Sequence, residues 1–225
     1  MRRLGHIFSI ALITAGVVLL ADVAITLAYQ EPLSAIYASI KQGEAEGELD
    51  ELEARYPTAA DRHAVVDVKA RKRRIAILAQ RFAESAEPGQ AIGRIVAPAM
   101  DGLDMVVVQG TDAASLQRGP GHYPETPFPG EGGTVGIAGH RTTYLAPFRH
   151  IDSVLAGDRI VLEMPYAHFF YRVQKTQIVD PGDVGIVKDV GYQRLVLSAC
   201  HPLYSAAQRY IVFAKLVRER ATGDD

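Results

Sequence analysis

The hydrophobic pattern of the chain begins with one long apolar run. From Ile7 to Ala28 almost every residue is apolar, and Asp22 is the only charge. A helix needs about 20 such residues to cross a bilayer, so the run predicts a single-pass membrane anchor. A cleaved signal peptide is the alternative, because small residues follow the apolar core. Arg2 and Arg3 precede the run, which favours an N-terminus in the cytoplasm and an extracytoplasmic remainder.

A polar, helical pattern follows from about residue 30 to residue 85. Five glutamates fall between Glu44 and Glu53, and Pro57 interrupts the pattern. Thr58 followed by Asp61 predicts the N-terminal cap of a further helix. That helix carries basic residues between positions 69 and 74, which we interpret as a solvated face, with contact to anionic lipid as the alternative. We interpret this part of the chain as a juxtamembrane stalk.

The pattern then changes to short segments rich in Val, Ile, Phe and Tyr, separated by turn residues. The predicted strands are Ala91 to Pro98, Met105 to Val108, Thr134 to Ala138, Arg159 to Met164, His168 to Val179, Arg194 to Ala199 and Tyr210 to Val217. Many short strands with few helices favour an all-β sandwich or barrel. The loop from Gly119 to Gly133 contains four prolines and five glycines, which predicts neither strand nor helix.

Composition narrows the class of protein. With 48% hydrophobic and 22% charged residues, a chain of 225 residues can bury a substantial core, which excludes global disorder. The net charge of −2 gives no reason to expect a nucleic-acid partner. We therefore expect three parts: a cytoplasmic tip and anchor at 1–28, a helical stalk at 29–88 and a β-rich domain at 89–225.

The single cysteine, Cys200, stands where a nucleophile could work. A lone thiol is either buried and inert or catalytic, and it leaves no internal disulfide. Cys200 ends the apolar run that begins at Leu195, and Arg209 opens the next predicted strand. Neighbouring strands joined by so short a loop would place the thiol and the guanidinium at one end of a sheet. That arrangement suits acyl transfer, in which a thiolate attacks a carbonyl and a cation stabilises the oxyanion.

Two histidines are candidates for the acid/base partner of the thiol. His201 is next to Cys200, but adjacent residues of a strand point to opposite faces, so it is a poor base. His140 follows the predicted strand Thr134 to Ala138, whose small residues leave room around an imidazole. Spacing alone does not distinguish His140 from a structural histidine.

The two segments together resemble the sortase family. The stretch Gly133 to Thr142 reads Gly-Thr-Val-Gly-Ile-Ala-Gly-His-Arg-Thr, and Leu197 to Pro202 reads Leu-Ser-Ala-Cys-His-Pro with Arg209 nine residues after the cysteine. The resemblance extends from Ala91 to Arg218 and implies an eight-stranded β-barrel. It also implies a cysteine transpeptidase in which Cys200 is the nucleophile, His140 protonates the leaving amine and Arg209 holds the oxyanion and the substrate.

The resemblance further implies substrates and partners. Sortases cleave the Thr–Gly bond of a C-terminal sorting signal on surface proteins and pass the acyl group to an amine of a cell-wall precursor or a pilin. The family commonly has threonines where this chain has Val196 and Ala199. The Cys-His-Pro continuation and Tyr144 are most similar to class E sortases, which implies a Leu-Ala-x-Thr-Gly signal beside the common Leu-Pro-x-Thr-Gly. Ser198, Ala199 and Tyr144 are the expected substrate contacts, with a packed rim aromatic as the alternative for Tyr144.

No cofactor and no metal are expected, because no acidic cluster with calcium-ligand spacing occurs in the β-rich domain. Two other functions remain open at this point. One is an extracytoplasmic cysteine peptidase that releases the acyl group to water, which would use the same residues. The other is an anchored binding protein that has lost its activity.

Overall fold

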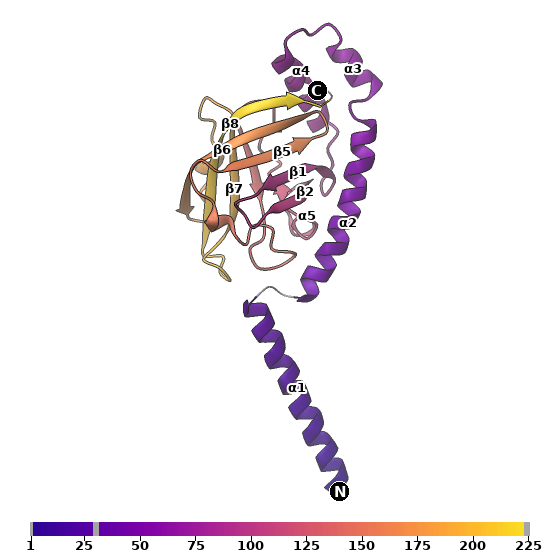
Figure 1. The fold of residues 1–225 in the computed structure, drawn as a ribbon, viewed down its shortest axis with the longest axis vertical. Coiled ribbons are helices and arrows are strands. Elements are labelled where there is room, and N and C mark those ends of the chain that lie inside the picture. The colour runs from indigo at the N-terminus through magenta and orange to yellow at the C-terminus, as the bar shows by residue number, and fades with distance from the viewer. Residues whose placement is uncertain (1, 29–31, 223–225) are drawn as a thin grey trace.

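The computed structural model describes residues 2–28 and 32–222. Eight strands form a closed β-barrel in the order β1-β2-β3-β4-β7-β8-β6-β5, and the helices lie outside it (Figure 1). The strands are β1 Ala91–Ala97, β2 Leu103–Gln109, β3 Gly121–His122, β4 Thr134–Ala138, β5 Arg159–Met164, β6 Ala167–Val179, β7 Arg194–His201 and β8 Gln208–Ala221. The helices are α1 Arg2–Ala28, α2 Pro32–Arg55, α3 Ala59–Val65, α4 Arg71–Ala83 and α5 Ala113–Leu116, with 3-10 turns at Ile151–Ser153 (η1) and Val184–Val187 (η2).

The predicted eight-stranded all-β barrel is confirmed, and its seven predicted strands occur within a few residues of their expected bounds. The prediction for the Gly- and Pro-rich loop was wrong in one place, because β3 lies within it. β3 is only two residues long, pairs in parallel with β2 and antiparallel with β4, and so closes the barrel between them. The sequence pattern does not reveal β3, because this strand contains a glycine and a histidine and no β-branched residue.

The N-terminal apolar run forms one continuous helix, α1. The segment Gly5–Ala24 has a mean hydropathy of 2.3 and is long and apolar enough to cross a membrane. The expected boundary between anchor and stalk at residue 29 lies outside the described residues.

The predicted stalk is helical, but it packs on the barrel. Ala45, Leu49 and Leu52 of α2 are buried in the same hydrophobic core as the barrel interior, as are Ile75 and Phe82 of α4. A polar contact fixes the position of α2: the Gln42 side chain accepts a hydrogen bond from the Val106 N–H and donates one to the Val106 carbonyl, both at 3.1 Å. Helix α2 therefore packs against the outside of the barrel as part of the same domain.

Helices α3 and α4 lie at the end of the barrel opposite the start of α2 (Figure 1). Thr58 caps α3 as predicted, in a reciprocal capping box with Asp61, and Asp61 also pairs with Arg81 of α4. The basic residues between 69 and 74 thus lie far along the chain and the fold from α1. This position favours the solvated face over lipid contact.

Side chains alternate along the strands that form the site. Leu195, Leu197 and Ala199 of β7 belong to the main core, together with Val212 and Ala214 of β8. The intervening residues face outward, where Val196, Ile211 and Phe213 form a second small cluster with Val179. Alternation by two places Ser198, Cys200 and Arg209 on this outer face as well.

A buried histidine supports the loop after β3. His122 is 1% exposed, and its Nδ1 lies 2.9 Å from Oε1 of Gln109. Burial lowers the pKa of His122 to about 4.

The unfolded chain therefore binds a proton at His122 at higher pH than the folded one, so the free energy of unfolding should fall as the pH drops from about 6.5 to about 4. The expected loss from this group is roughly 3 kcal/mol, since one pKa unit corresponds to about 1.4 kcal/mol. Urea unfolding at several pH values should show this slope in the wild type and a reduced slope in His122→Gln. His63→Gln, at an exposed position, is the control; an equal slope in His122→Gln would contradict the prediction.

Candidate active site

Cys200 and Arg209 lie directly opposite each other on neighbouring strands. In the antiparallel ladder of β7 and β8 the Cα partner of Cys200 is Arg209. Side chains of directly opposed residues point to the same face, with Cβ atoms about 5 Å apart. The hairpin therefore places Cys200 and Arg209 side by side at one end of the sheet, as predicted from the sequence. Arg209 Nη1 donates to the carbonyls of Ala206 and Gln208, each at 2.9 Å, which ties the guanidinium to the loop before β8.

His140 leaves the same end of the sheet on the other side of β7. Strand β4 pairs in parallel with β7, with Ala138 opposite Ser198, and the Gly139 N–H donates to the Ser198 carbonyl at 3.0 Å. His140 and Cys200 each follow these paired residues by two positions. Because β4 and β7 run in the same direction, their carboxyl ends meet at one edge, with His140 and Arg209 on opposite sides of Cys200.

His201 has a different environment. Its ring lies 5.8 Å from that of Tyr210, and its Nδ1 is 3.4 Å from Nη1 of Arg141. An arginine can only donate, so Nδ1 of His201 is the acceptor in this contact. The alternation of side chains along β7 turns His201 away from the face of Cys200, as predicted from its position.

The imidazole of His140 is half-buried beneath an aromatic residue. The ring of Tyr144 lies 5.3 Å from the ring of His140, and the Phe148 N–H donates to the His140 carbonyl at 2.9 Å. Burial lowers the pKa of His140 below its ordinary value. The residue before His140 must be small, because a Cβ at Gly139 would lie 2.7 Å from the ring of Phe148. Glycine at position 139 therefore leaves room for the ring of Phe148, whose backbone N–H holds the His140 carbonyl.

A small cavity of about 150 Å³ lies beside Arg209 on the outer face of the barrel. Its lining joins Arg209 and Ser198 to Tyr123, to Val179 at the end of β6, and to the β6–β7 connection, which supplies Pro181, Val184, Ile186 and Val187. The Tyr123 hydroxyl hydrogen-bonds the Ser198 hydroxyl at 2.8 Å. Tyr123 lies flat against β4 because residue 136 is glycine; a Cβ there would lie 2.5 Å from the tyrosine ring.

The structure separates the three expected substrate contacts. Ser198 lines the small cavity. Tyr144 stands on the other side of the nucleophile strand, against His140. Ala199 is 3% exposed and packs in the barrel core, so its methyl group faces away from the cavity. Sequence reasoning did not select Tyr123, although it lies within the span of the resemblance from Ala91 to Arg218.

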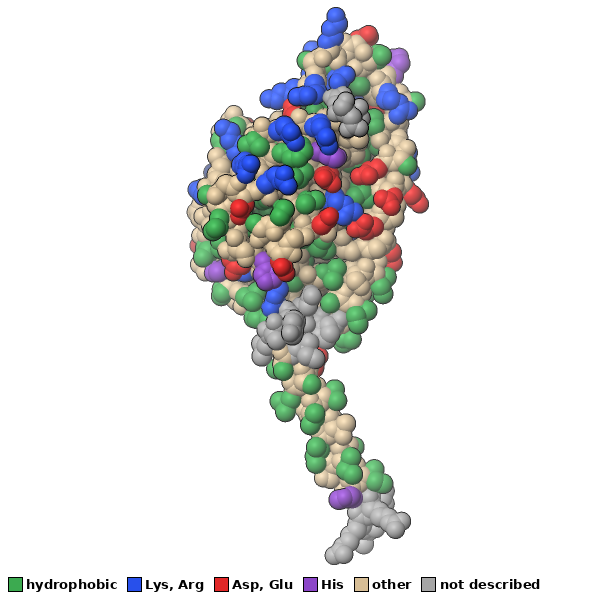
Figure 2. Space-filling view, in the orientation of Figure 1, with side chains coloured by type: hydrophobic (Ala, Val, Ile, Leu, Met, Phe, Trp, Pro, Cys, Tyr) green, Lys and Arg blue, Asp and Glu red, His purple; other side chains and the backbone are tan. Residues whose placement is uncertain are grey.

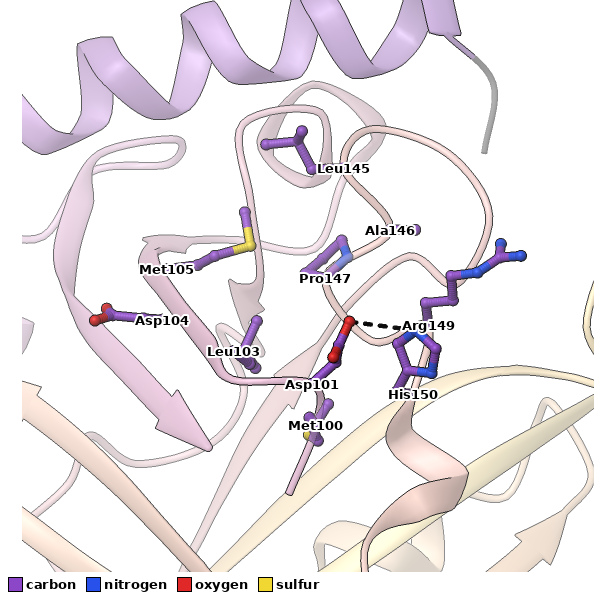
Figure 3. Close-up of a pocket in the computed structure, with 10 residues that line it drawn as sticks. All are labelled: Met100, Asp101, Leu103, Asp104, Met105, Leu145, Ala146, Pro147, Arg149 and His150. Carbon is purple, nitrogen blue, oxygen red and sulfur yellow. Dashed lines mark ion pairs between the residues drawn. The ribbon is translucent and has the colours of Figure 1, made fainter. Parts of the chain in front are cut away.

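A larger cavity of about 540 Å³ lies beyond the histidine loop, between the β1–β2 turn and residues 145–150 (Figure 3). Asp101 and His150 face each other across it at 3.8 Å, while Arg149 extends away from it (Figure 3). Arg149 instead donates to the hydroxyl of Tyr204 at 3.4 Å. None of the three candidate catalytic residues lines this cavity, so the smaller one beside Arg209 is the better candidate for substrate.

Arg141, which sequence reasoning missed, joins the histidine loop to the nucleophile strand. Its side chain is 3% exposed, and Nη2 pairs with Asp152 at 2.7 Å and donates to the Arg149 carbonyl at 3.2 Å. Nη1 lies 3.5 Å from the Cys200 carbonyl, a long contact to the backbone of β7. The signal was visible in the sequence as a charged residue directly after His140, but its partners are distant along the chain.

Arg141→Lys should lower kcat by roughly tenfold to a hundredfold, since small misplacements of reacting groups cost that much. One ammonium cannot reach Asp152 and the carbonyls of Arg149 and Cys200 together. KM for a peptide substrate should change little, because Arg141 does not line the cavity. Steady-state kinetics on the full-length protein in detergent measure both constants. Arg172→Lys is the control, and a normal kcat in Arg141→Lys would limit Arg141 to a role in folding.

Within residues 2–28 and 32–222, no group of three or more His, Cys, Asp or Glu side chains is arranged to hold a metal ion. The chemistry available at this edge of the barrel is that of a thiol, an imidazole and a guanidinium.

The comparisons with known proteins identify the family. A model described as "Sortase domain" matches residues 95–217, and the chain therefore belongs to the sortase family of transpeptidases. It is 36% identical over 135 residues to sortase D of Bacillus subtilis, which covers 58% of this chain and 66% of that protein. It is 31% identical over 156 residues to sortase SrtE1 of Streptomyces coelicolor, covering 63% of this chain and 44% of that protein. The chain thus spans just under two thirds of one curated relative and less than half of the other.

Solved structures agree on the barrel. Sortase E1 of Streptomyces coelicolor, solved with a tripeptide in its active site, superposes with a TM-score of 0.57 at 30% identity and covers 63% of this chain and 98% of that one. Sortase D5 of Clostridium perfringens gives 0.61 at 24% identity, covers 77% of this chain and 98% of its own, and supports the fold alone. The predicted similarity to class E sortases is confirmed by relatives that include SrtE1 and SrtE2, alongside sortase D.

Proposed function

We propose that this protein is a membrane-anchored cysteine transpeptidase in which Cys200 is the nucleophile, His140 the acid/base and Arg209 the oxyanion donor. The observation that carries the proposal is the register of three strands: Cys200 opposite Arg209 in one ladder, and His140 beyond the parallel pair on the other side. This register supports the proposal because it puts the three residues, from different parts of the chain, at one edge of the barrel.

In the first half of the reaction, the imidazole of His140 takes the thiol proton and the thiolate attacks the threonine carbonyl carbon of the Thr–Gly bond. The carbonyl oxygen becomes an oxyanion, which the guanidinium of Arg209 stabilises. The C–N bond then breaks, the glycine nitrogen takes the proton from the imidazolium, and a thioester remains on Cys200.

In the second half, an amine attacks the thioester carbon and gives its proton to His140. The C–S bond breaks, the thiolate recovers the proton, and a new amide is formed. The lowered pKa of His140 suits this cycle, because the imidazole is mostly neutral at pH 7 and ready to accept a proton at each attack.

The small cavity beside Arg209 supports recognition of an extended peptide. Its apolar wall on the β6–β7 connection suits the leucine of a Leu-Ala-x-Thr-Gly or Leu-Pro-x-Thr-Gly signal, and the paired hydroxyls of Tyr123 and Ser198 offer polar contacts nearer the nucleophile. The proposed partners are surface proteins that carry such signals, with an amine of a cell-wall precursor or a pilin as acceptor. Helix α1 supports a single-pass anchor with the barrel outside the cytoplasm.

The full-length protein in detergent, incubated with signal peptides and an added amine, tests the proposal by mass spectrometry. The expected products are the free glycine-containing fragment and an amide joining threonine to the amine. Cleavage without an amide, at any amine concentration, would instead favour a peptidase that releases its product to water. No cleavage of any signal peptide would favour an inactive binding protein.

Arg209→Lys should lose most of the activity, at least about a hundredfold, as removal of an oxyanion donor typically does. An ammonium lacks the planar fork that can donate to the oxyanion while Nη1 holds the loop carbonyls. Arg218→Lys, further along β8 and stacked on Phe170, is the control in the same strand. Near-normal turnover in Arg209→Lys would remove Arg209 from the oxyanion role.

A further inference from the structure

The first turns of α2 expose one apolar face. Leu33, Ile36, Tyr37 and Ile40 are 75%, 61%, 44% and 59% exposed. Their spacing of i, i+3, i+4 and i+7 places all four within one stripe of the helix. The opposite side of the same turns, with Ser34 and Ala38, is buried against the domain.

The same stripe changes its chemistry further along the helix. At 3.6 residues per turn, the face of Leu33 and Ile40 continues through Glu44, Glu48 and Glu51. Hydrophobic side chains occur along α1 and on the end of the domain that adjoins it, and acidic side chains gather higher over α2 (Figure 2). A helix in water has no reason to expose isoleucines on one part of a face and glutamates on the next, whereas a helix that enters a membrane surface does.

The position of this stripe along the chain points to a bilayer. The apolar run of α1 ends at Ala28, and α2 begins at Pro32. Four residues of fully extended chain span at most about 14 Å. From Leu33 to Ile40 the helix rises about 10 Å, comparable to the depth at which interfacial helices bury their apolar face.

We propose that Leu33, Ile36, Tyr37 and Ile40 lie in the surface of the lipid bilayer and hold the active-site end of the barrel against the membrane. The inference rests on the proposed anchoring through α1. The partner is the bilayer interface itself, and the glutamates of the same stripe mark where α2 leaves it.

The same turns contact the loop that carries the histidine. Ser34 Oγ accepts a hydrogen bond from the Tyr144 N–H at 3.2 Å, and the ring of Tyr37 lies 6.5 Å from that of Tyr144. Tyr144 in turn packs on His140. The proposed lipid-facing turns and the histidine loop are therefore in direct contact, so the catalytic edge lies close to the proposed bilayer surface.

Depth-dependent fluorescence quenching tests the location of the stripe. The full-length protein with Cys200→Ala, which removes the native thiol, receives one new cysteine at a time: Val17→Cys in α1, Ile36→Cys in the apolar stripe or Glu51→Cys in its acidic continuation. Each is labelled with an environment-sensitive fluorophore and reconstituted into vesicles of phosphatidylethanolamine and phosphatidylglycerol that contain nitroxide-labelled lipids.

We expect quenching and a blue-shifted emission at Val17 and at Ile36, and neither at Glu51. Quenching at Val17 with an Ile36 signal equal to that at Glu51 would overturn the inference while leaving the anchor intact. A label at Val17 that is also not quenched would overturn both.

Kinetics test the consequence for substrates. In the same vesicles, the combined variant Leu33→Gln, Ile36→Gln and Ile40→Gln should keep its rate on a soluble signal peptide and lose severalfold on the same peptide tethered by a transmembrane helix. The control, Val66→Gln with Val217→Gln, removes exposed apolar groups elsewhere and should change neither rate. Equal rates on the tethered peptide in both variants would overturn the link between the stripe and the substrate.

Discussion

Cys200→Ala is expected to abolish turnover, with a loss of at least about four orders of magnitude, because removal of a covalent nucleophile leaves only binding and oxyanion stabilisation. The methyl group fits the same strand end, which is only partly buried, so the fold should be unchanged. Since Cys200 is the only cysteine of the chain, a thioester trapped by acid quench and seen as a mass increase on the wild type has one possible location.

Two measurements separate loss of the nucleophile from loss of the fold in Cys200→Ala. An alkylating reagent should label the wild type once and Cys200→Ala not at all, and the labelled wild type should be inactive. The urea midpoints of the two proteins should agree. Turnover above about one per cent of wild type in a folded Cys200→Ala protein would show that another group starts the reaction.

His140→Ala should also lose nearly all activity, by about a thousandfold or more, since the thiol loses the base that ionises it and the leaving amine loses its acid. His201→Ala is the matched control: it is adjacent to the nucleophile in sequence, but it lies on the opposite face of β7 and accepts a hydrogen bond from Arg141. It should retain most of its activity.

The pH dependence follows from the burial of His140. A lowered pKa means that the neutral imidazole, which accepts the thiol proton, predominates at about pH 6.5 and above, so the acidic limb of kcat/KM should lie below about pH 6.5, where His140 becomes protonated. A profile of kcat/KM against pH from 4 to 9 measures it. Unchanged activity in His140→Ala, or equal losses in the His140 and His201 variants, would contradict the assignment.

Much of the fold could be predicted because the strands are rich in β-branched residues and are separated by clear turns. The pairing of Cys200 with Arg209 was also accessible, since two strands joined by a short loop can hardly avoid each other. β3 was missed because two residues, one of them glycine, carry no periodicity. Its place is set by its neighbours in the barrel.

The contacts of Arg141 and of α2 were out of reach for a different reason. Arg141 meets the backbone of Cys200 across 59 positions of sequence, and Gln42 meets Val106 across 64. A polar helix with buried alanines and leucines on one side predicts that something packs there, but not which strand. The packing of α2 on the barrel therefore had to come from the structure.

The two hydrogen bonds between the Gln42 side chain and Val106 fix the rotation of α2 about its own axis. The Gln42 amide pairs with both the N–H and the carbonyl of Val106 in β2, so the helix can neither slide along the strand nor turn about its own axis without breaking both bonds. Each residue turns a helix by 100°, so a one-residue insertion between Ala38 and Gln42 would swing Leu33 and Ile36 about a quarter turn around the domain. In the proposed arrangement, the number of residues between the end of α1 and Gln42 therefore sets which side of the domain the apolar stripe faces.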